Sequence, residues 1–255
     1  MPAIWASLIT GDKKHFIDAY KATPQIPSSS VWGVFLRVHD ELSLEMVSPK
    51  TREIVYNALI SKGAEFRKGL GVSGRLANFL DNNPNRIEMA FSILMSMPGI
   101  PIVYYGDEVG VCGFTDPDNR RTYPWGNEDK ELISFHKDMI HVHKTCKELL
   151  TGSLKHVVSD YNVIGYGRFN KDAQTLVVVN NNDSPMVKEI SVWELGVPKD
   201  CAMEQLILTT KDGYTTKKAQ FLVVSGKVLV NLPPKSGIVL RHVNKQANKK
   251  FLHFE

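Results

Sequence analysis

The first half of the sequence alternates between amphipathic segments of helical length and short apolar runs. Two continuous apolar runs, residues 31–36 and 100–105, are each short enough for a strand buried on both faces, as in a parallel sheet. This part of the chain therefore predicts an α/β fold. Apolar residues at helical spacing predict helices over 4–9, 15–20, 50–62, 86–97 and 130–144.

From about residue 147 the pattern changes to short runs of β-branched and aromatic residues separated by turn signals. Regularly spaced short strands of this kind are typical of an antiparallel β-sandwich, so the second half predicts an all-β domain. We place the two domains at residues 1–146 and 147–255. The predicted strands cover 163–169, 175–180, 187–192, 204–208, 221–224, 228–232 and 238–243.

Composition narrows the classes of function. The 255 residues carry a net charge of +4, and the basic residues do not gather in a pattern typical of a nucleic-acid-binding face. No apolar stretch is long enough to cross a membrane. Cys112, Cys146 and Cys201 are far apart, which favours free thiols in a reducing compartment. With no signal peptide visible at the N-terminus, we expect a cytoplasmic protein.

We expect neither a metal nor a cofactor. His136, His141 and His143 share one predicted helix, but His141 and His143 are two positions apart and face different ways. That spacing does not build a zinc site.

Polar residues follow both apolar runs of the first half. Arg37, His39 and Asp40 come after the first run, and Tyr105 ends the second. At the carboxyl ends of the strands of a β/α barrel, such side chains face the active site. A carboxylate there can stabilise positive charge developing on a sugar ring, and an imidazole can donate a hydrogen bond to a sugar hydroxyl. Spacing alone equally fits a loop cap or a surface ion pair. For Asp107 and Glu108 we expect a helix cap or loop packing.

Three segments resemble the alpha-amylase superfamily. FLRVHDEL over 35–42 resembles its fourth conserved motif, PGIPIVYYGDE over 98–108 its eighth barrel strand, and DPDNRRTYPW over 116–125 the loop that follows. The resemblance covers residues 1 to about 145, and the β-rich remainder resembles the family's C-terminal domain. It implies the C-terminal portion of a (β/α)8 barrel, with strands seven and eight, followed by an antiparallel β-sandwich.

The resemblance also implies roles for single residues. Asp40 matches the third catalytic carboxylate, which stabilises the transition state, and His39 matches the histidine that binds the sugar. Arg37, Tyr105 and Arg121 are further candidates for substrate binding. The implied substrate is an alpha-glucan or a maltose-like oligosaccharide. The family's nucleophile and acid/base patterns do not occur in this chain, which reads as beginning at the sixth helix, so the N-terminal half of the barrel is an expected partner.

Within the superfamily, residues 35–47 look most like trehalose synthases, which interconvert maltose and trehalose. Two features depart from that pattern. Val38 stands where the motif has asparagine, and the loop over 110–127 is shorter and more like that of amylases. Hydrolysis and glucosyl transfer therefore both remain open.

The alternative is a catalytically incompetent remnant that binds glucan or a protein partner. Tyr123, Trp125 and Trp193 could stack on pyranose rings in such a module. Large aromatic side chains more often pack in cores, and core packing is what we expect of these three.

Overall fold

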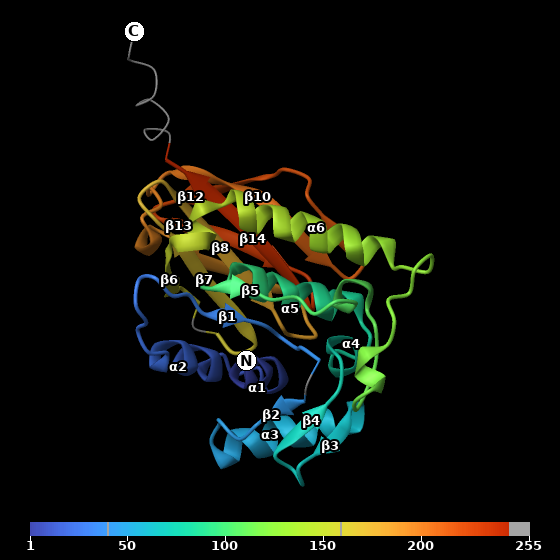
Figure 1. Cartoon of the computed structure of the whole chain (residues 1–255). Coiled ribbons are helices and arrows are strands. Elements are labelled where there is room, and N and C mark those ends of the chain that lie inside the picture. Colours follow the sequence, from blue (N-terminus) through green and yellow to red (C-terminus); the bar gives the residue numbers. More distant parts are fainter. Residues whose placement is uncertain (40, 159, 245–255) are drawn as a thin grey trace.

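The computed structural model describes residues 1–39, 41–158 and 160–244 of the chain (Figure 1). Asp40, the predicted transition-state stabiliser, lies outside the described residues. All five predicted helices are confirmed: α1 (Pro2–Thr10), α2 (Lys14–Ala22), α3 (Pro49–Leu59, continued by the 3-10 turn Ile60–Lys62), α5 (Pro84–Ser96) and α6 (Lys130–Thr145). Among the described helices, none is sufficiently long and apolar to cross a bilayer.

Local chemistry explains where three of these helices begin. The side chains of Ser48, Asn83 and Asp129 each accept a hydrogen bond from a backbone N–H in the first turn of α3, α5 and α6. The chain turns just before α5, where Asp81 and Asn82 adopt positive φ angles. Each cap satisfies a backbone donor that would otherwise lack a partner.

The two predicted barrel strands are shorter and more exposed than expected. β1 (Gly33–Val34) pairs in parallel with β5 (Ile100–Pro101), as neighbouring barrel strands do. Trp32 and Ile100, however, are 45% and 55% exposed. The prediction of strands buried on both faces was therefore wrong. The reason is that, within the described residues, each strand has a hydrogen-bonded neighbour on one edge only.

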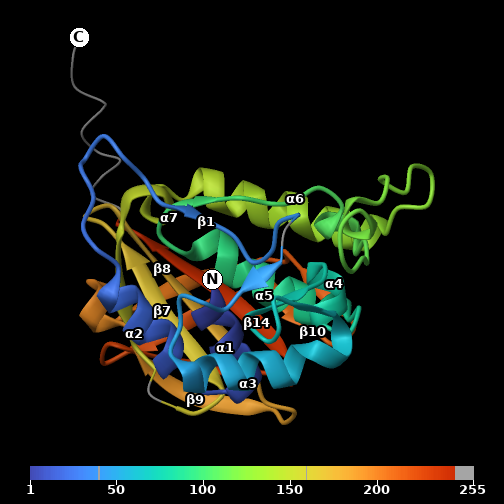
Figure 2. The ribbon, with the colours of Figure 1, turned by 60° about the horizontal axis from the view of Figure 1, so that its bottom comes forward.

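Several short elements between α2 and α6 were not predicted. β2 (Leu42–Ser43), β3 (Ala64–Phe66) and β4 (Gly71–Ser73) form a three-stranded sheet in the order β2-β4-β3. Figure 2 shows this part of the chain beside α3 and α4. Strands of two or three residues are too short for an alternating pattern to show. The remaining elements are α4 (Leu76–Phe79) and the 3-10 turns η2 (Asp107–Val109) and η3 (Asp118–Arg120).

The second half folds into one antiparallel sheet of nine strands, which confirms the predicted antiparallel fold. The order is β6-β7-β8-β14-β10-β12-β13-β9, with β11 paired to β10. All seven predicted strands are present; β6 and β11 were missed. Their bounds are β6 Ser153–His156, β7 Val163–Phe169, β8 Ala173–Asn180, β9 Met186–Ser191, β10 Cys201–Thr210, β11 Gly213–Thr215, β12 Gln220–Val224, β13 Lys227–Leu232 and β14 Ser236–Val243.

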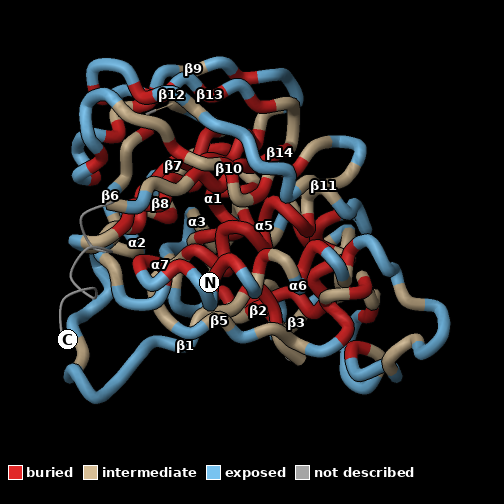
Figure 3. Tube along the Cα trace, turned by 90° about the horizontal axis from the view of Figure 1, so that it is seen from above, coloured by how far each residue is buried: buried red, intermediate tan, exposed pale blue. Residues whose placement is uncertain are grey.

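The sheet curls, and its two faces serve two cores. In Figure 3 the buried segments gather in the middle of the molecule, around α5. Along β8, Leu176 and Val178 face a core enclosed by the sheet itself. Val177 and Val179 point the other way and join the core made with the helices. This alternation is the period of two that a strand imposes on its side chains.

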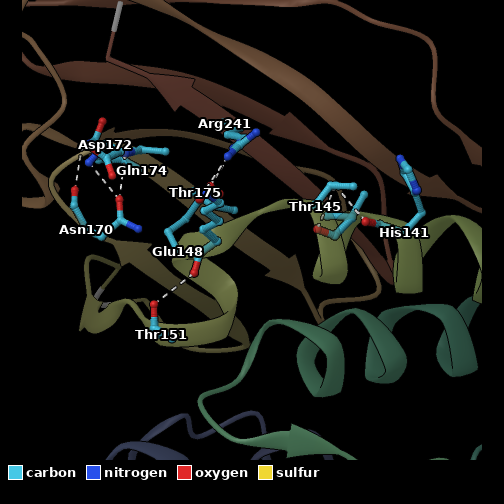
Figure 4. A network of polar contacts seen from close by, with 12 residues as sticks. His141, Thr145, Glu148, Thr151, Asn170, Asp172, Gln174, Thr175 and Arg241 are labelled. Carbon is cyan, nitrogen blue, oxygen red and sulfur yellow. Dashed lines mark hydrogen bonds and ion pairs between the residues drawn. The ribbon is translucent and has the colours of Figure 1, made fainter. Parts of the chain in front are cut away.

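Buried polar contacts reinforce the junction between the helices and the sheet. Glu148, on the short helix α7 (Lys147–Thr151), accepts hydrogen bonds from Arg241 at 2.7 and 3.1 Å and from Thr175 at 2.6 Å (Figure 4). The hydroxyls of Ser96 on α5 and Tyr166 on β7 lie 2.7 Å apart. The domain boundary at residues 146 and 147 stays a prediction.

Candidate functional site

The segment after β1 carries the first cluster of predicted site residues. The indole N–H of Trp5 on α1 donates to the carbonyl of Leu36 at 3.1 Å, which fixes the chain just before Arg37. Arg37 is 1% exposed, its Nε donates to the carbonyl of Gly74 at 2.9 Å, and its guanidinium lies 5.4 Å from the Phe79 ring. Because this guanidinium is so deeply buried, it is better suited to orienting other side chains than to contacting a substrate directly.

His39 is half-buried beside the segment that follows β5. Its carbonyl accepts a hydrogen bond from the side-chain amide of Asn119, and its ring lies 6.0 Å from the ring of Tyr104. The two strand ends are thereby joined, because His39 follows β1 and Tyr104 follows β5. His39, which directly precedes Asp40 in sequence, therefore lies at the common carboxyl edge of the parallel pair.

Tyr105 and Arg121 meet at the outer side of this edge. The ring of Tyr105 lies 4.7 Å from that of Tyr104, and its hydroxyl donates to the carbonyl of Arg121 at 2.9 Å. The guanidinium of Arg121 pairs with Asp118 at 2.7 Å, and this hydrogen bond lowers the pKa of Asp118. The side chain of Arg121 is thus engaged within its own loop, and Tyr105 remains 41% exposed.

Arg75 links the segment after β5 to the loop that carries Asn119, and the sequence analysis did not predict it. Its guanidinium donates to the carbonyl of Asn119 at 2.9 Å, to the carbonyl of Tyr105 and to the carboxylate of Asp107 at 3.1 Å. It also lies 4.3 Å from the ring centroid of Tyr104, a cation–π distance. One buried cation therefore contacts both the segment after β5 and the loop that carries Asn119.

Of the two roles expected for Asp107, a helix cap or loop packing, the structure shows the packing and not the cap. Its side chain makes no cap to η2; it is 4% exposed and forms the buried ion pair with Arg75. Burial raises the pKa of Asp107 to about 7, against the lowering influence of Arg75 and Arg37. A carboxylate enclosed with two arginines is a structural centre of this edge, since burying it unpaired would cost several kcal/mol.

We call the side chains of Arg37, His39, Tyr104, Tyr105 and Arg121 at this edge the rim. The structure brings four predicted site residues together here, and it adds Tyr104, Arg75 and Asn119. The available sequence signal for Arg75 was a single charged residue in an otherwise apolar and small-residue run, GVSGRLANFL. Within the part of the chain that the structure describes, no group of three or more acidic, histidine or cysteine side chains is arranged to hold a metal.

A groove of about 740 Å³ begins beside Tyr105 and runs along α6. The rings of Tyr123 and Trp125 in its wall are 4.5 Å apart. Trp125 is 80% exposed and Trp193, elsewhere on the molecule, is 55% exposed. Core packing was therefore the wrong expectation for both tryptophans. Trp125 is exposed because it stands on the loop that extends from the body before α6 (Figure 1).

Comparisons with known proteins find relatives of the chain in sequence and in fold. Over 111 residues, 44% of the chain, it is 40% identical to trehalose synthase/amylase of Mycobacterium tuberculosis. Over 166 residues it is 33% identical to amylopullulanase of Thermoanaerobacter thermohydrosulfuricus. Among solved structures, the alpha-amylase of Geobacillus thermoleovorans complexed with acarbose superposes on 96% of the chain with a TM-score of 0.65 at 18% identity. The Anoxybacillus alpha-amylase gives 0.66 over 95% at 20% identity.

The matches cover only part of each relative. The chain spans 18% of the mycobacterial enzyme, 10% of the amylopullulanase, and 47% and 45% of the two amylase structures. No family model matches the chain. In sequence and in fold, the chain resembles the C-terminal part of enzymes of the alpha-amylase superfamily, trehalose synthase among them.

Proposed function

We propose that this chain forms the strand-seven and strand-eight side of an active site that acts on alpha-glucosidic bonds, by hydrolysis or by glucosyl transfer. The observation that carries the proposal is the rim. His39 and Tyr105 come from different parallel strands and lie at one carboxyl edge, where barrel enzymes place their catalytic groups. The implied substrate is an alpha-glucan or a maltose-like oligosaccharide.

In this proposal Asp40 and the rim residues have separate roles, Asp40 in stabilising charge and the rim residues in positioning the sugar. Asp40 stabilises positive charge that builds on the sugar in the transition state. His39 hydrogen-bonds a hydroxyl of the same sugar, and Tyr105 offers a ring face that is partly exposed. Arg37, enclosed beside them, orients carboxylates from below. Arg121 acts through its carbonyl, which fixes the hydroxyl of Tyr105. No cofactor takes part in this scheme.

A retaining reaction also needs a nucleophile and an acid/base, two carboxylates about 5 Å apart. In our proposal both come from further barrel strands that pack beside β1 and β5. Support comes from a groove of about 670 Å³ along β1 that is lined largely by apolar side chains, Trp32 and Phe35 among them. The N-terminal half of a barrel would cover it and pair with the open strand edges.

The experiment measures turnover of maltose and of a chromogenic maltoside. The chain is assayed alone and after co-expression with the N-terminal barrel half of a trehalose synthase relative. We expect activity only in the complemented sample, and its loss in Asp40→Ala. Asp18→Ala, a surface change on α2, is the matched control. Activity that survives Asp40→Ala, or a complex that assembles and stays inactive, would refute the proposed role.

A second candidate is a binding module without catalysis, favoured by the exposure of Trp125. It predicts that the chain retains glucan on affinity gels and that Asp40→Ala leaves this retention unchanged.

We also propose a cytoplasmic location, supported by the free thiols of Cys112, Cys146 and Cys201.

A further inference from the structure

Helices cover the outer face of the curled nine-stranded sheet over only part of its width. α5 packs against β8, β10 and β14, and α7 packs against β7 and β8. Past β10 the sheet continues through β12, β13 and β9, and Figures 2 and 3 show β9 at the opposite side of the molecule from α6. On these three strands alternate residues, Val223, Val228 and Ile190 among them, belong to the core that the sheet encloses. The residues between them therefore point outward.

The outward positions of these strands carry apolar side chains. Four of them are 57% to 71% exposed: Leu222 and Val224 on β12, Leu229 on β13 and Val187 on β9. A sheet with one face in solvent normally alternates between apolar residues inside and polar residues outside. Apolar side chains that gather on the solvent face of three neighbouring strands mark a site of interaction. We call these four side chains the outer patch.

Two side chains of opposite charge lie among the residues of the outer patch. In the ladder, Lys227 lies opposite Val224, and Glu189 lies opposite Leu229. The two charged groups are 3.5 Å apart and both side chains are more than half exposed, so their mutual attraction is weak and can be exchanged for another partner. A two-fold axis through the patch would set Lys227 of each copy against Glu189 of the other. The patch is thus complementary in charge to a second copy of itself, whereas a lipid surface or a nucleic acid would require an excess of positive charge.

A hollow of about 500 Å³ adjoins the outer patch, over β10 and β14. It begins beside Leu222, because Ala202 in its wall is the ladder partner of Leu222. Val243 adds apolar surface to the wall, and the charged groups of Glu204 and Arg241 are both engaged in ion pairs within the chain. A ridge that lies next to a hollow fits a copy of itself turned about a two-fold axis, since each ridge then enters the hollow of the other copy.

We propose that the outer patch is the interface of a homodimer, in which two copies of this chain pack these sheet faces together about a two-fold axis. Leu222 and Val224 of each copy lie in the hollow of the other, and Lys227 pairs with Glu189 across the interface. Figures 2 and 3 show β9 and β1 on opposite sides of the molecule, so the dimer leaves the open edge of β1 free. The inference therefore stands independently of the proposed function.

Sedimentation velocity measures the dimer directly. Between about 1 and about 100 μM, we expect the monomer to convert to a dimer as the concentration rises. Leu229→Glu should weaken the dimer by at least about tenfold, because it places an unpaired carboxylate in the contact. Met46→Glu is the matched control, since Met46 is apolar and 90% exposed but lies in the groove beside β1. Both positions are exposed, so both variants should keep the circular dichroism of the parent chain.

A charge exchange tests how the two copies face each other. Lys227→Glu alone should weaken the dimer by about threefold to tenfold, because it sets glutamates against each other across the axis, and Glu189→Lys alone should weaken it as much. A mixture of the two variant chains should dimerise as the parent does, since each chain then supplies the charge that the other lacks. Recovery on mixing can arise only between chains, because neither variant regains the ion pair within itself.

Three results would overturn the proposal. The first is a chain that stays monomeric throughout the concentration range; should removal of residues 245–255 then allow it to dimerise, its own C-terminal segment is the occupant of the outer patch. The second is a dimer that Leu229→Glu leaves intact and Met46→Glu abolishes, which would place the contact at the open edge of β1. The third is a mixture of the two charge variants that dimerises no better than either variant alone.

Discussion

Glu88 is a buried acid, and replacing it with a neutral residue should stabilise the protein more and more as the pH rises. It lies on α5, is 1% exposed, and its Oε2 has no hydrogen-bond partner among the described residues. Burial, helped by the nearby carboxylates of Glu131 and Asp129, raises its pKa to about 7. The small pocket beside it is lined as well by Lys211 and Asp212 on the loop before β11.

The magnitude follows from the difference between the folded and unfolded pKa. A value of about 7 against an ordinary 4.5 corresponds to about 3 kcal/mol, at about 1.36 kcal/mol for each pH unit. Between these two values the folded state of Glu88 holds more protons than the unfolded state, so stability falls as pH rises. The cost is absent below pH 4.5 and complete above pH 7.

The variant Glu88→Gln carries no charge at any pH. Relative to the parent chain, its free energy of unfolding should rise by about 3 kcal/mol between pH 4.5 and pH 8, equivalent to about 6–12 °C in Tm. Urea unfolding at several pH values, followed by circular dichroism, measures this difference. Any fixed cost of burying the amide drops out, because it is the same at every pH.

Glu148→Gln is the matched control with the opposite sign. Burial raises the pKa of Glu148, but hydrogen bonds from Arg241 and Thr175 outweigh it and lower the pKa below its ordinary value. Its stabilisation is therefore present above pH 4.5 and lost as pH falls. A Glu88→Gln effect that is flat from pH 4.5 to pH 8 would show that Glu88 ionises in the fold without cost, and the reasoning would fail.

Three further substitutions test the packing. Glu148→Leu should cost about 3 kcal/mol of unfolding free energy by leaving Arg241 without its anion, and the double variant with Arg241→Met should recover part of it; additive losses in urea would contradict this. Asn83→Ala should cost about 1 kcal/mol by removing the cap of α5, and an unchanged Tm would be inconsistent with that cap. Tyr166→Phe should cost about 1–2 kcal/mol of unfolding free energy, because the buried hydroxyl of Ser96 would lose one hydrogen-bond partner. Calorimetry measures this loss, and an unchanged stability would show that the contact is unimportant.

The sequence predicted the elements whose stability comes from their own segment and its near neighbours. α5 and α6 were predicted because their apolar residues recur at helical spacing. The strands of the second half were found because turns separate them and one face is always buried. β6 was missed because its exposed and half-buried positions alternate without a strongly apolar face.

The two barrel strands, β1 and β5, were predicted to be more buried than they are, for a different reason. An apolar run indicates that its residues suit a buried environment. In the described part of the chain, however, β1 and β5 each pair with only one neighbouring strand. At the site, strand ends and the family motif located His39 and Tyr105. Arg75 could not be predicted, because nothing in its sequence neighbourhood shows that a carboxylate thirty-two positions later will lie 3.1 Å away.

The contrast between the rim and the strands beneath it suggests which part of the function the chain can carry by itself. The contacts that order the rim are all internal: Arg75 with Asp107, Asn119 with His39, and Tyr105 with Arg121. The rim can therefore be preorganised before any other barrel strand arrives, and a preorganised site binds without first paying for order. Turnover requires more, because none of the rim side chains is a carboxylate and a retaining reaction uses a pair of them. Sugar binding should thus be separable from turnover, with binding retained by this chain and turnover dependent on whatever covers the open edges of β1 and β5.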